Sequence, residues 1–454
     1  MKPYKYACYE FSFLSMESNK RLTLSVTRKT PELLCPAEST PHEFKILSDI
    51  DGQIFIRKYI KTINFYKKNP FMEGKDPVKI IREAISKALV FYYPLAGRLL
   101  ENTGRKLVVE CTGQGVVFVE ADTDATLQHF GDALYPPFPN SDELTLDAPD
   151  NRGIIVDIPL MFIQVTRLKC GGFIFSNNFN HTMCDGVGLS KFLFAVGELA
   201  RGATFPSIRP VWDRHLLTSS ILHHEYGAGT GRIPAPTEQM VERSFFFTSA
   251  EISALRRSLP PHLQRCSKFE IVAGCVWRCQ TIALSPKPYE EMKFIGVMDN
   301  RKNIKPPLLV GYYGNVLKLL VAVTTAGELS NNPLYYAVEL VRSTKHEAET
   351  ACELSNSADL MVISDPLSLS VGNTYIVSNL THLGLERMDV GWGTAVYGGV
   401  PKGSYWPTGI SQVSWYLGFK DGIVVPVCLP LESMKVFEKH LQATITATPI
   451  SSSL

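Results

Sequence analysis

Strand-like and helix-like segments alternate along this chain, and the alternation occurs twice, once on each side of an irregular middle stretch. In the first half, an alternating pattern near Leu22 to Val26 indicates a strand, and a helix is expected from Asp76-Pro77. Strands at 162–168 and 173–179 follow, joined by a hairpin signal at 169–172, and then a helix at 189–199. In the second half, a capping box at 267–270 begins a helix, and strands are expected near 294–298 and 316–323. Another helix is expected near 334–351, followed by strands near 413–419 and 422–428. This alternation predicts an α/β fold with two similar domains.

The middle stretch, residues 206–242, contains four prolines and the sequence GAGTG. Such composition predicts a long surface crossover rather than a further domain. GAGTG lacks the spacing and the preceding strand of a dinucleotide-binding fingerprint. We therefore expect an N-terminal α/β domain at residues 1–205 and a C-terminal α/β domain at residues 243–454.

The composition excludes several classes of function. The 46 basic and 44 acidic residues give a net charge of +2, which offers no general reason to expect nucleic acid or an anionic membrane as a partner. No apolar run approaches ~18 residues, so no membrane span is expected. The ten cysteines form no CxxC pair, which indicates free thiols in a reducing compartment. The first residues make a poor secretory signal, and Met16 is an alternative start.

The stretch NFNHTMCDGVG, residues 178–188, places His181 where a strand ends, with Gly186 and Gly188 allowing a tight turn after it. A zinc pair at this spacing would need a helix and a third ligand, and no such pattern is present. A serine hydrolase would need a GxSxG motif, which the chain lacks. The remaining chemical interpretation is a histidine that acts as general base on a substrate hydroxyl. The motif alone is also compatible with a buried structural histidine.

Several short blocks resemble those of the plant BAHD acyltransferases, in the same order. HTMCDG matches the HxxxD signature of that family, and DVGWG at 389–393 resembles its DFGWG signature, with Val390 in place of the usual Phe. FYYPLAGRL, MDNR and GYYGN also resemble family blocks. With VYGGVPKG and GIVVPVCLP, the chain is most similar to the benzyl alcohol O-benzoyltransferases, and the resemblance covers residues 20 to 445.

The resemblance implies a two-domain chloramphenicol-acetyltransferase-like fold with mixed sheets and a channel between the domains. His181 would lie near the middle of the channel, with coenzyme A entering from one face and the alcohol from the other. The implied activity is acyl transfer from an acyl-CoA, with benzoyl-CoA favoured, to benzyl alcohol or a similar small alcohol. We expect no cofactor, no bound metal and no covalent intermediate, and a monomeric enzyme. Hydroxycinnamoyl-transferring relatives have a Trp at the place of Leu380, so the acyl pocket is expected to differ.

The expected site residues have different roles. His181 and Asp389 form the catalytic set, with His181 as the base and Asp389 as an anchor that shapes the channel or the coenzyme site. Asp185 is expected to point away from His181 and to pair with Arg301, so that this pair supports the catalytic loop. Ser267 and Ser378 are assigned to coenzyme A binding. Trp392 is interpreted as a core residue.

Other functions stay open on the sequence alone. The chain is compatible with acylation of an amine, or with acetyl or anthraniloyl transfer to a larger specialised metabolite. Condensation of carrier-bound acyl groups, as in the condensation domains of peptide synthetases, is another alternative. Those domains commonly have a second His just before the catalytic one, where this chain has Asn180. A binding protein that kept the fold is a further class, which the intact His181 and Asp185 argue against.

The C-terminal tripeptide, Ser452-Ser453-Leu454, is similar to the Ser-Lys-Leu peroxisomal address but lacks its basic middle residue. The tail before it contains a proline and a serine run, which is typical of a mobile end. We expect a peroxisomal protein, with the cytoplasm as the alternative.

Overall fold

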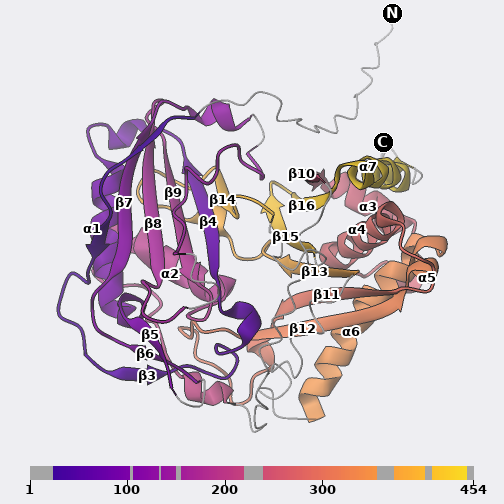
Figure 1. Cartoon of the computed structure of the whole chain (residues 1–454), viewed down its shortest axis with the longest axis horizontal. Helices are drawn as coiled ribbons and strands as arrows, with labels where there is room; N and C mark the ends of the chain where they lie inside the picture. The colour runs from indigo at the N-terminus through magenta and orange to yellow at the C-terminus, as the bar shows by residue number, and fades with distance from the viewer. Residues whose placement is uncertain are drawn as a thin grey trace, which may run out of the picture.

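A computed structural model describes residues 24–102, 106–131, 134–149, 155–218, 239–354, 373–403 and 412–446. Two sheets lie side by side in it, each with helices packed on its outer side (Figure 1). Both sheets mix parallel and antiparallel neighbours, as expected for this fold class. Met16, Leu22 and the C-terminal tripeptide lie outside the described residues.

The first sheet has the strand order β1-β7-β8-β9-β4-β14, with β2 also paired to β7. Its strands are β1 (Val26–Arg28), β2 (Glu32–Leu34), β4 (Tyr59–Tyr66), β7 (Val116–Thr123), β8 (Met161–Leu168), β9 (Phe173–Asn180) and β14 (Tyr397–Gly399). Helices α1 (Pro77–Phe91) and α2 (Gly186–Ala200) pack against each other and cover one face. A small sheet of β3 (Phe44–Ile46), β6 (Leu107–Glu110) and β5 (Arg98–Glu101) lies beside it.

The second sheet has the order β10-β16-β15-β13-β11-β12. Its strands are β10 (Met240–Phe247), β11 (Glu291–Asp299), β12 (Leu317–Thr325), β13 (Thr374–Asn379), β15 (Gln412–Phe419) and β16 (Gly422–Pro430). Its helices are α3 (Ser249–Arg257), α4 (Lys268–Leu284), α5 (Ala326–Asn331), α6 (Leu334–Leu354) and α7 (Leu431–Thr446). A single apolar core joins α4 to its neighbouring helices and to the sheet, so this half has a core of its own.

Local signals in the sequence account for several of these elements. The Asp76 side chain accepts a hydrogen bond from the Val78 N–H at 3.2 Å, and Pro77 occupies the first turn, so α1 begins where the sequence predicts. Its buried residues follow helical spacing: Val78, Ile81, Ala84, Ile85, Ala88 and Leu89. The predicted capping box of α4 and the predicted hairpin of β8 and β9 are also present.

Helix α2 begins at Gly186, three residues before the predicted start. The reason is that the Asp185 carboxylate caps the helix, accepting from the Gly188 N–H at 2.9 Å. The sequence suggested that Gly186 and Gly188 form a tight turn. They are instead in the first turn of α2, in close contact with other segments. A Cβ atom at Gly188 would lie 1.9 Å from the carbonyl oxygen of Tyr313, so only glycine fits there.

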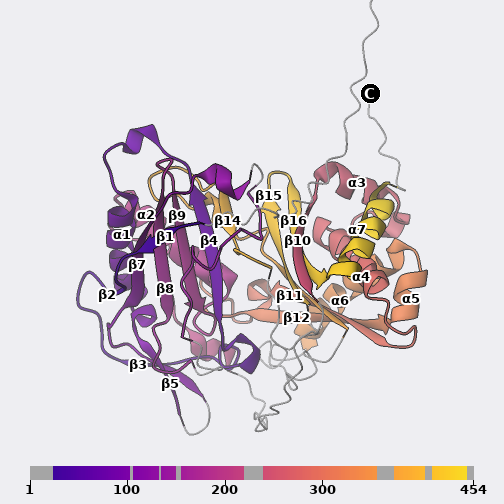
Figure 2. The same ribbon diagram turned by 45° about the horizontal axis from the view of Figure 1, so that its top comes forward.

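Residues 383–400 belong in space to the first half of the molecule, although they come late in the sequence. Strand β14 pairs with β4, with Tyr397 opposite Phe65 (Figure 2). Asn64 Nδ2 donates to the carbonyl of Leu385 at 2.7 Å, and the Tyr66 hydroxyl donates to the carbonyl of Met388 at 3.1 Å. The predicted contiguous domain at 243–454 is therefore wrong for this segment, because the DVGWG loop packs on the first sheet.

No described helix combines the length and the apolar character that a membrane crossing would require.

Candidate active site

His181 follows directly on the last residue of β9, in the turn that leads to α2. Its N–H donates to the carbonyl of Lys58 at 2.8 Å, which ties the turn to the start of β4. The Asn180 side chain accepts from the Thr182 N–H at 3.1 Å and from the Thr182 hydroxyl at 2.6 Å. The backbone around the imidazole is therefore fixed on both sides of His181.

The imidazole of His181 has the properties of a neutral base. Burial, and after it the positive charge of Lys58, lowers the pKa of His181 from its ordinary 6.5. Its Nδ1 atom has no hydrogen-bond partner among the described residues. The Phe179 ring lies on one side of it, with 5.9 Å between the ring centroids. A neutral histidine at physiological pH has a lone pair with which to accept a proton.

Asp185 binds Arg301 in a bidentate ion pair and does not bind the imidazole in the described contacts. Both N–O distances are 2.9 Å, and the two side chains are 3% and 12% exposed. Burial opposes ionisation of Asp185, but Arg301, together with the N–H groups of Gly188 and Val316, outweighs it and lowers the pKa of the carboxyl group. Asp185 also accepts from the Val316 N–H at 3.1 Å. The predicted pairing is therefore present, and it links the end of the His181 turn to residues 301–316.

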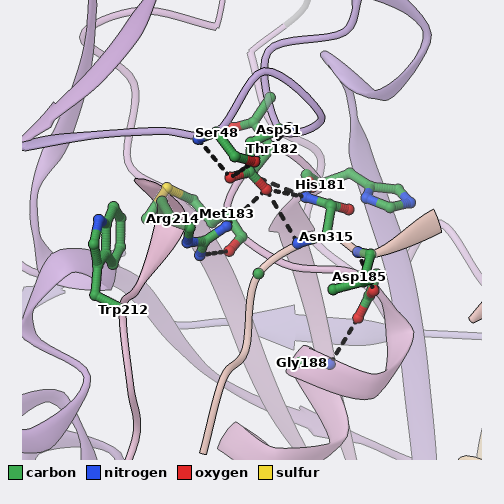
Figure 3. Close-up of polar contacts among 12 residues, drawn as sticks. Ser48, Asp51, His181, Thr182, Met183, Asp185, Gly188, Trp212, Arg214 and Asn315 are labelled. Atoms are coloured by element: carbon green, nitrogen blue, oxygen red, sulfur yellow. Dashed lines mark hydrogen bonds and ion pairs between the residues drawn. The ribbon is translucent and has the colours of Figure 1, made fainter. Parts of the chain in front are cut away.

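A second buried ion pair, between Asp51 and Arg214, was missed by the sequence reasoning. Arg214 Nη1 lies 2.6 Å from Asp51 Oδ1, and Arg214 Nη2 donates to the carbonyl of Met183 at 2.6 Å. The guanidinium also faces the aromatic rings of Trp212, Tyr312 and Tyr313, at 4.5, 5.5 and 5.2 Å from their centroids. In Figure 3 the two side chains of the pair lie to the left of the His181 backbone, and the imidazole points to the right.

Asn315 connects that second pair to His181. Its Nδ2 atom donates to Asp51 Oδ1 and to the carbonyl of His181, both at 2.8 Å. Its backbone N–H also donates to Asp51, at 3.1 Å. The sequence offered one indication of this network, the place of Asn315 in the GYYGN block. Asp51 and Arg214 gave none, because charged residues usually lie on the surface.

Asp389 uses its carboxylate within its own loop. Oδ1 accepts from the N–H groups of Gly391 at 2.8 Å and Gly393 at 2.9 Å, and the carbonyl of Asp389 accepts from Arg201. No described contact joins Asp389 to His181. The carboxylate is occupied in shaping its own loop, as expected of an anchor, and the described contacts give no support for grouping Asp389 with His181 as catalytic.

The two apolar residues of the same motif pack in the core. Trp392 packs edge-on against Phe173, at 5.3 Å between the ring centroids, and is 8% exposed. Val390 is fully buried. Trp392 is therefore a core residue, as interpreted from the sequence.

A cavity of about 430 Å³ lies at the start of α4. Ser267, Lys268, Asn379, Thr381 and Lys420 are among its lining residues. The N-terminus of α4 and the two lysines favour a negatively charged ligand in this place, although one carboxylate, Asp421, also lines it. Ser378 is not one of the lining residues but precedes Asn379 on β13, so of the two serines only Ser267 reaches the cavity. In the described part of the chain, no three His, Cys, Asp or Glu side chains come together as metal ligands would.

Comparison with known proteins agrees with this architecture. A sequence model of the Transferase family matches residues 24–444. The chain is 48% identical to benzyl alcohol O-benzoyltransferase of Nicotiana tabacum over 449 residues, which is 95% of this chain and 96% of that protein. It is 44% identical to 13-hydroxylupanine O-tigloyltransferase of Lupinus albus over 434 residues, covering 92% and 95% of the two chains.

Solved structures share the fold at lower sequence identity. The crystal structure of vinorine synthase matches with a TM-score of 0.69 and 21% identity, covering 92% of this chain and 98% of that one. TRI101 of F. sporotrichioides, complexed with coenzyme A and T-2, matches with a TM-score of 0.67 and 16% identity, covering 87% and 97%. The family model and the relatives identify an acyltransferase, and the solved structures share its fold of two α/β halves. The chain belongs to the Transferase family, that of the plant BAHD acyltransferases, as the sequence motifs indicated.

Proposed function

We propose that the protein transfers an acyl group from an acyl-CoA to the hydroxyl of a small alcohol, with His181 as general base. The observation that carries the proposal is the His181 turn, where the backbone N–H donates to Lys58, the backbone carbonyl accepts from Asn315, and burial lowers the pKa of the imidazole. Acyl transfer from a thioester needs an oriented alcohol and a base of near-neutral pKa, and no redox step.

The proposed reaction proceeds without an acyl-enzyme. His181 takes the hydroxyl proton as the alcohol oxygen bonds to the thioester carbonyl carbon, giving a tetrahedral oxyanion. The C–S bond then breaks, and the departing thiolate recovers the proton from the imidazolium. Cys184, three residues after His181, is a poor nucleophile because burial raises the pKa of its thiol far above the ordinary value.

The cavity at the start of α4 is the proposed place for part of coenzyme A. Lys268 and Lys420 supply positive charge there, and the helix N-terminus adds to it. The Ser267 hydroxyl accepts from the Glu270 N–H at 3.2 Å, so its contribution is to fix the helix end that faces the ligand. Ser378 would act only indirectly, through the position of Asn379.

Benzoyl-CoA and benzyl alcohol are the favoured substrates, because the relative from Nicotiana tabacum is named for that reaction and shares 48% of its residues. The relative from Lupinus albus is named for another acyl group and another acceptor at 44% identity. Transfer to a larger specialised metabolite is therefore the second candidate.

The test is an assay of free coenzyme A release with benzoyl-CoA, supplied alone, with benzyl alcohol, with larger alcohols and with amines. We expect release only with an alcohol, benzyl benzoate as the product with benzyl alcohol, and insensitivity to chelators. The protein incubated with donor alone should keep its unmodified mass. An acylated protein, or faster transfer to amines than to alcohols, would contradict the proposal.

We further propose a monomeric enzyme that resides in peroxisomes through the C-terminal tripeptide. Its small first residue and terminal leucine are those of the known address. A fluorescent protein fused to the N-terminus should be punctate with the intact tail and diffuse without Leu454. Diffuse fluorescence from the intact fusion would favour the cytoplasm.

A further inference from the structure

Lys58 lies directly opposite His181 across the pair of strands β4 and β9. In this antiparallel pair, Tyr59 is opposite Asn180 and Ile60 is opposite Phe179. The same register, extended by one residue, places Lys58 opposite His181, and the 2.8 Å bond from the His181 N–H to the Lys58 carbonyl agrees with it. Side chains that are directly opposite point to the same face, with Cβ atoms about 4.5–5.5 Å apart. The Lys58 side chain therefore begins beside the imidazole.

Two buried ion pairs also lie around the turn. Asp185, at the start of α2, binds Arg301, which follows β11. Asp51 binds Arg214, and these two contact the turn through Asn315 and the Met183 carbonyl. Asp185 raises the pKa of His181, but the combined effect of burial and Lys58 is larger and lowers it. The positive charge of Lys58 thus opposes protonation of the imidazole.

We propose that Lys58 is a further residue of the reaction site, where its positive charge keeps His181 in the neutral, proton-accepting form. The inference rests on the proposed role of His181 as base. Two adjacent groups that both become positive cannot take up protons independently, because the first proton disfavours the second. Burial lowers the pKa of Lys58 to about 7, so Lys58 is charged in the acidic range where a histidine titrates. The charge would thereby extend the active form of His181 to lower pH.

The sign of the effect is fixed by this arrangement. Activity requires the neutral imidazole and is lost as the pH falls through the pKa of His181. If the charge at position 58 is removed, the pKa of His181 rises, so activity is lost at a higher pH than in the wild type. The effect of burial on His181 remains, so only the part due to Lys58 disappears.

The test is the pH profile of kcat/KM for the wild type, Lys58→Met, Lys58→Gln, Lys58→Arg and Lys61→Met. Lys61 is a matched control, because it lies three residues along β4, on the opposite face, with its Nζ atom 2.5 Å from Asp147. We expect the acid limb of both neutral variants to rise by about 0.5–2 pH units, as two unit charges ~6 Å apart would give for dielectric constants between 80 and 20. Lys58→Arg keeps the charge and should keep the acid limb of the wild type, as should Lys61→Met.

Each outcome decides the question. An unshifted acid limb in the neutral variants, or an equal shift in Lys58→Arg, would overturn the role of Lys58. If neither neutral variant folds, Lys58 is a structural residue and the proposal is also wrong. A wild-type enzyme without acyl transfer, or without an acid limb, would instead contradict the proposed function itself.

Discussion

Asp51 and Arg214 form an ion pair that is almost completely removed from solvent, with side chains 0% and 1% exposed and an O–N distance of 2.6 Å. The pair contacts the His181 turn through two carbonyl oxygens, that of Met183 directly and that of His181 through Asn315. A buried pair is costly to break, because the remaining charge stays desolvated. The His181 turn is thus supported by two buried ion pairs, Asp51–Arg214 and Asp185–Arg301.

Asp51→Asn should destabilise the protein by about 3–5 kcal/mol, because it leaves the Arg214 guanidinium buried without its carboxylate. We expect a lower melting temperature and lower soluble yield, with reduced kcat in the protein that does fold. Arg82→Ala is the control, since Arg82 and Glu32 form an exposed pair with both side chains 44% exposed, and such pairs contribute about 0–1 kcal/mol. Equal melting temperatures for the two variants would contradict the structural role of Asp51.

Asp185→Asn should lower stability at least as clearly as it lowers turnover, because Arg301 loses its bidentate partner and α2 loses a charged cap. Since Arg301 lowers the pKa of Asp185, this contribution to stability is present above the ordinary carboxyl pKa and is lost as the pH falls through the lowered value. The melting temperature measured against pH reports it. Asp299→Asn is the matched control, because Asp299 also binds Arg301, at 2.8 Å, but is 31% exposed. An unchanged melting temperature with abolished activity in Asp185→Asn would favour a direct catalytic role.

Gly188→Ala should disrupt the fold of the turn, because the added Cβ atom would meet the Tyr313 carbonyl at 1.9 Å. Overpacking of this kind typically costs about 1–3 kcal/mol, and more where backbone must move. Gly52→Ala is the comparison, since its added Cβ would meet no atom closer than 3.7 Å. The melting temperatures of both variants test the close contact, and a Gly188→Ala protein as stable as Gly52→Ala would rule it out.

Local chemistry made part of this structure predictable from the sequence. Asp76 and Pro77 predict the start of α1, because helix capping depends on a few adjacent residues. Ser267 predicts the start of α4 in the same way. The partner of Asp185 was available only because Arg301 lies in a block that resembles the family. The sequence therefore predicted the fold class and the Asp185–Arg301 ion pair, which is one of the two buried pairs that contact the His181 turn.

Long-range packing accounts for what the sequence did not reveal. Asp51 and Arg214 are far apart in the sequence, and nothing local to either indicates burial. The position of Lys58 opposite His181 depends on the register of β4 and β9, which a pattern of alternating residues leaves open. The return of residues 383–400 to the first sheet depends likewise on the pairing of β14 with β4.

The activity of His181→Ala tests the central claim most directly. With benzoyl-CoA and benzyl alcohol as substrates, and His382→Ala as the control on an exposed histidine, kcat/KM should fall about 100- to 10,000-fold for His181→Ala alone. The melting temperature should stay near that of the wild type, because the described contacts that fix this turn are made by the backbone of His181 rather than by its ring. A folded His181→Ala protein that turns over at close to the wild-type rate would contradict the assignment of His181 as the base.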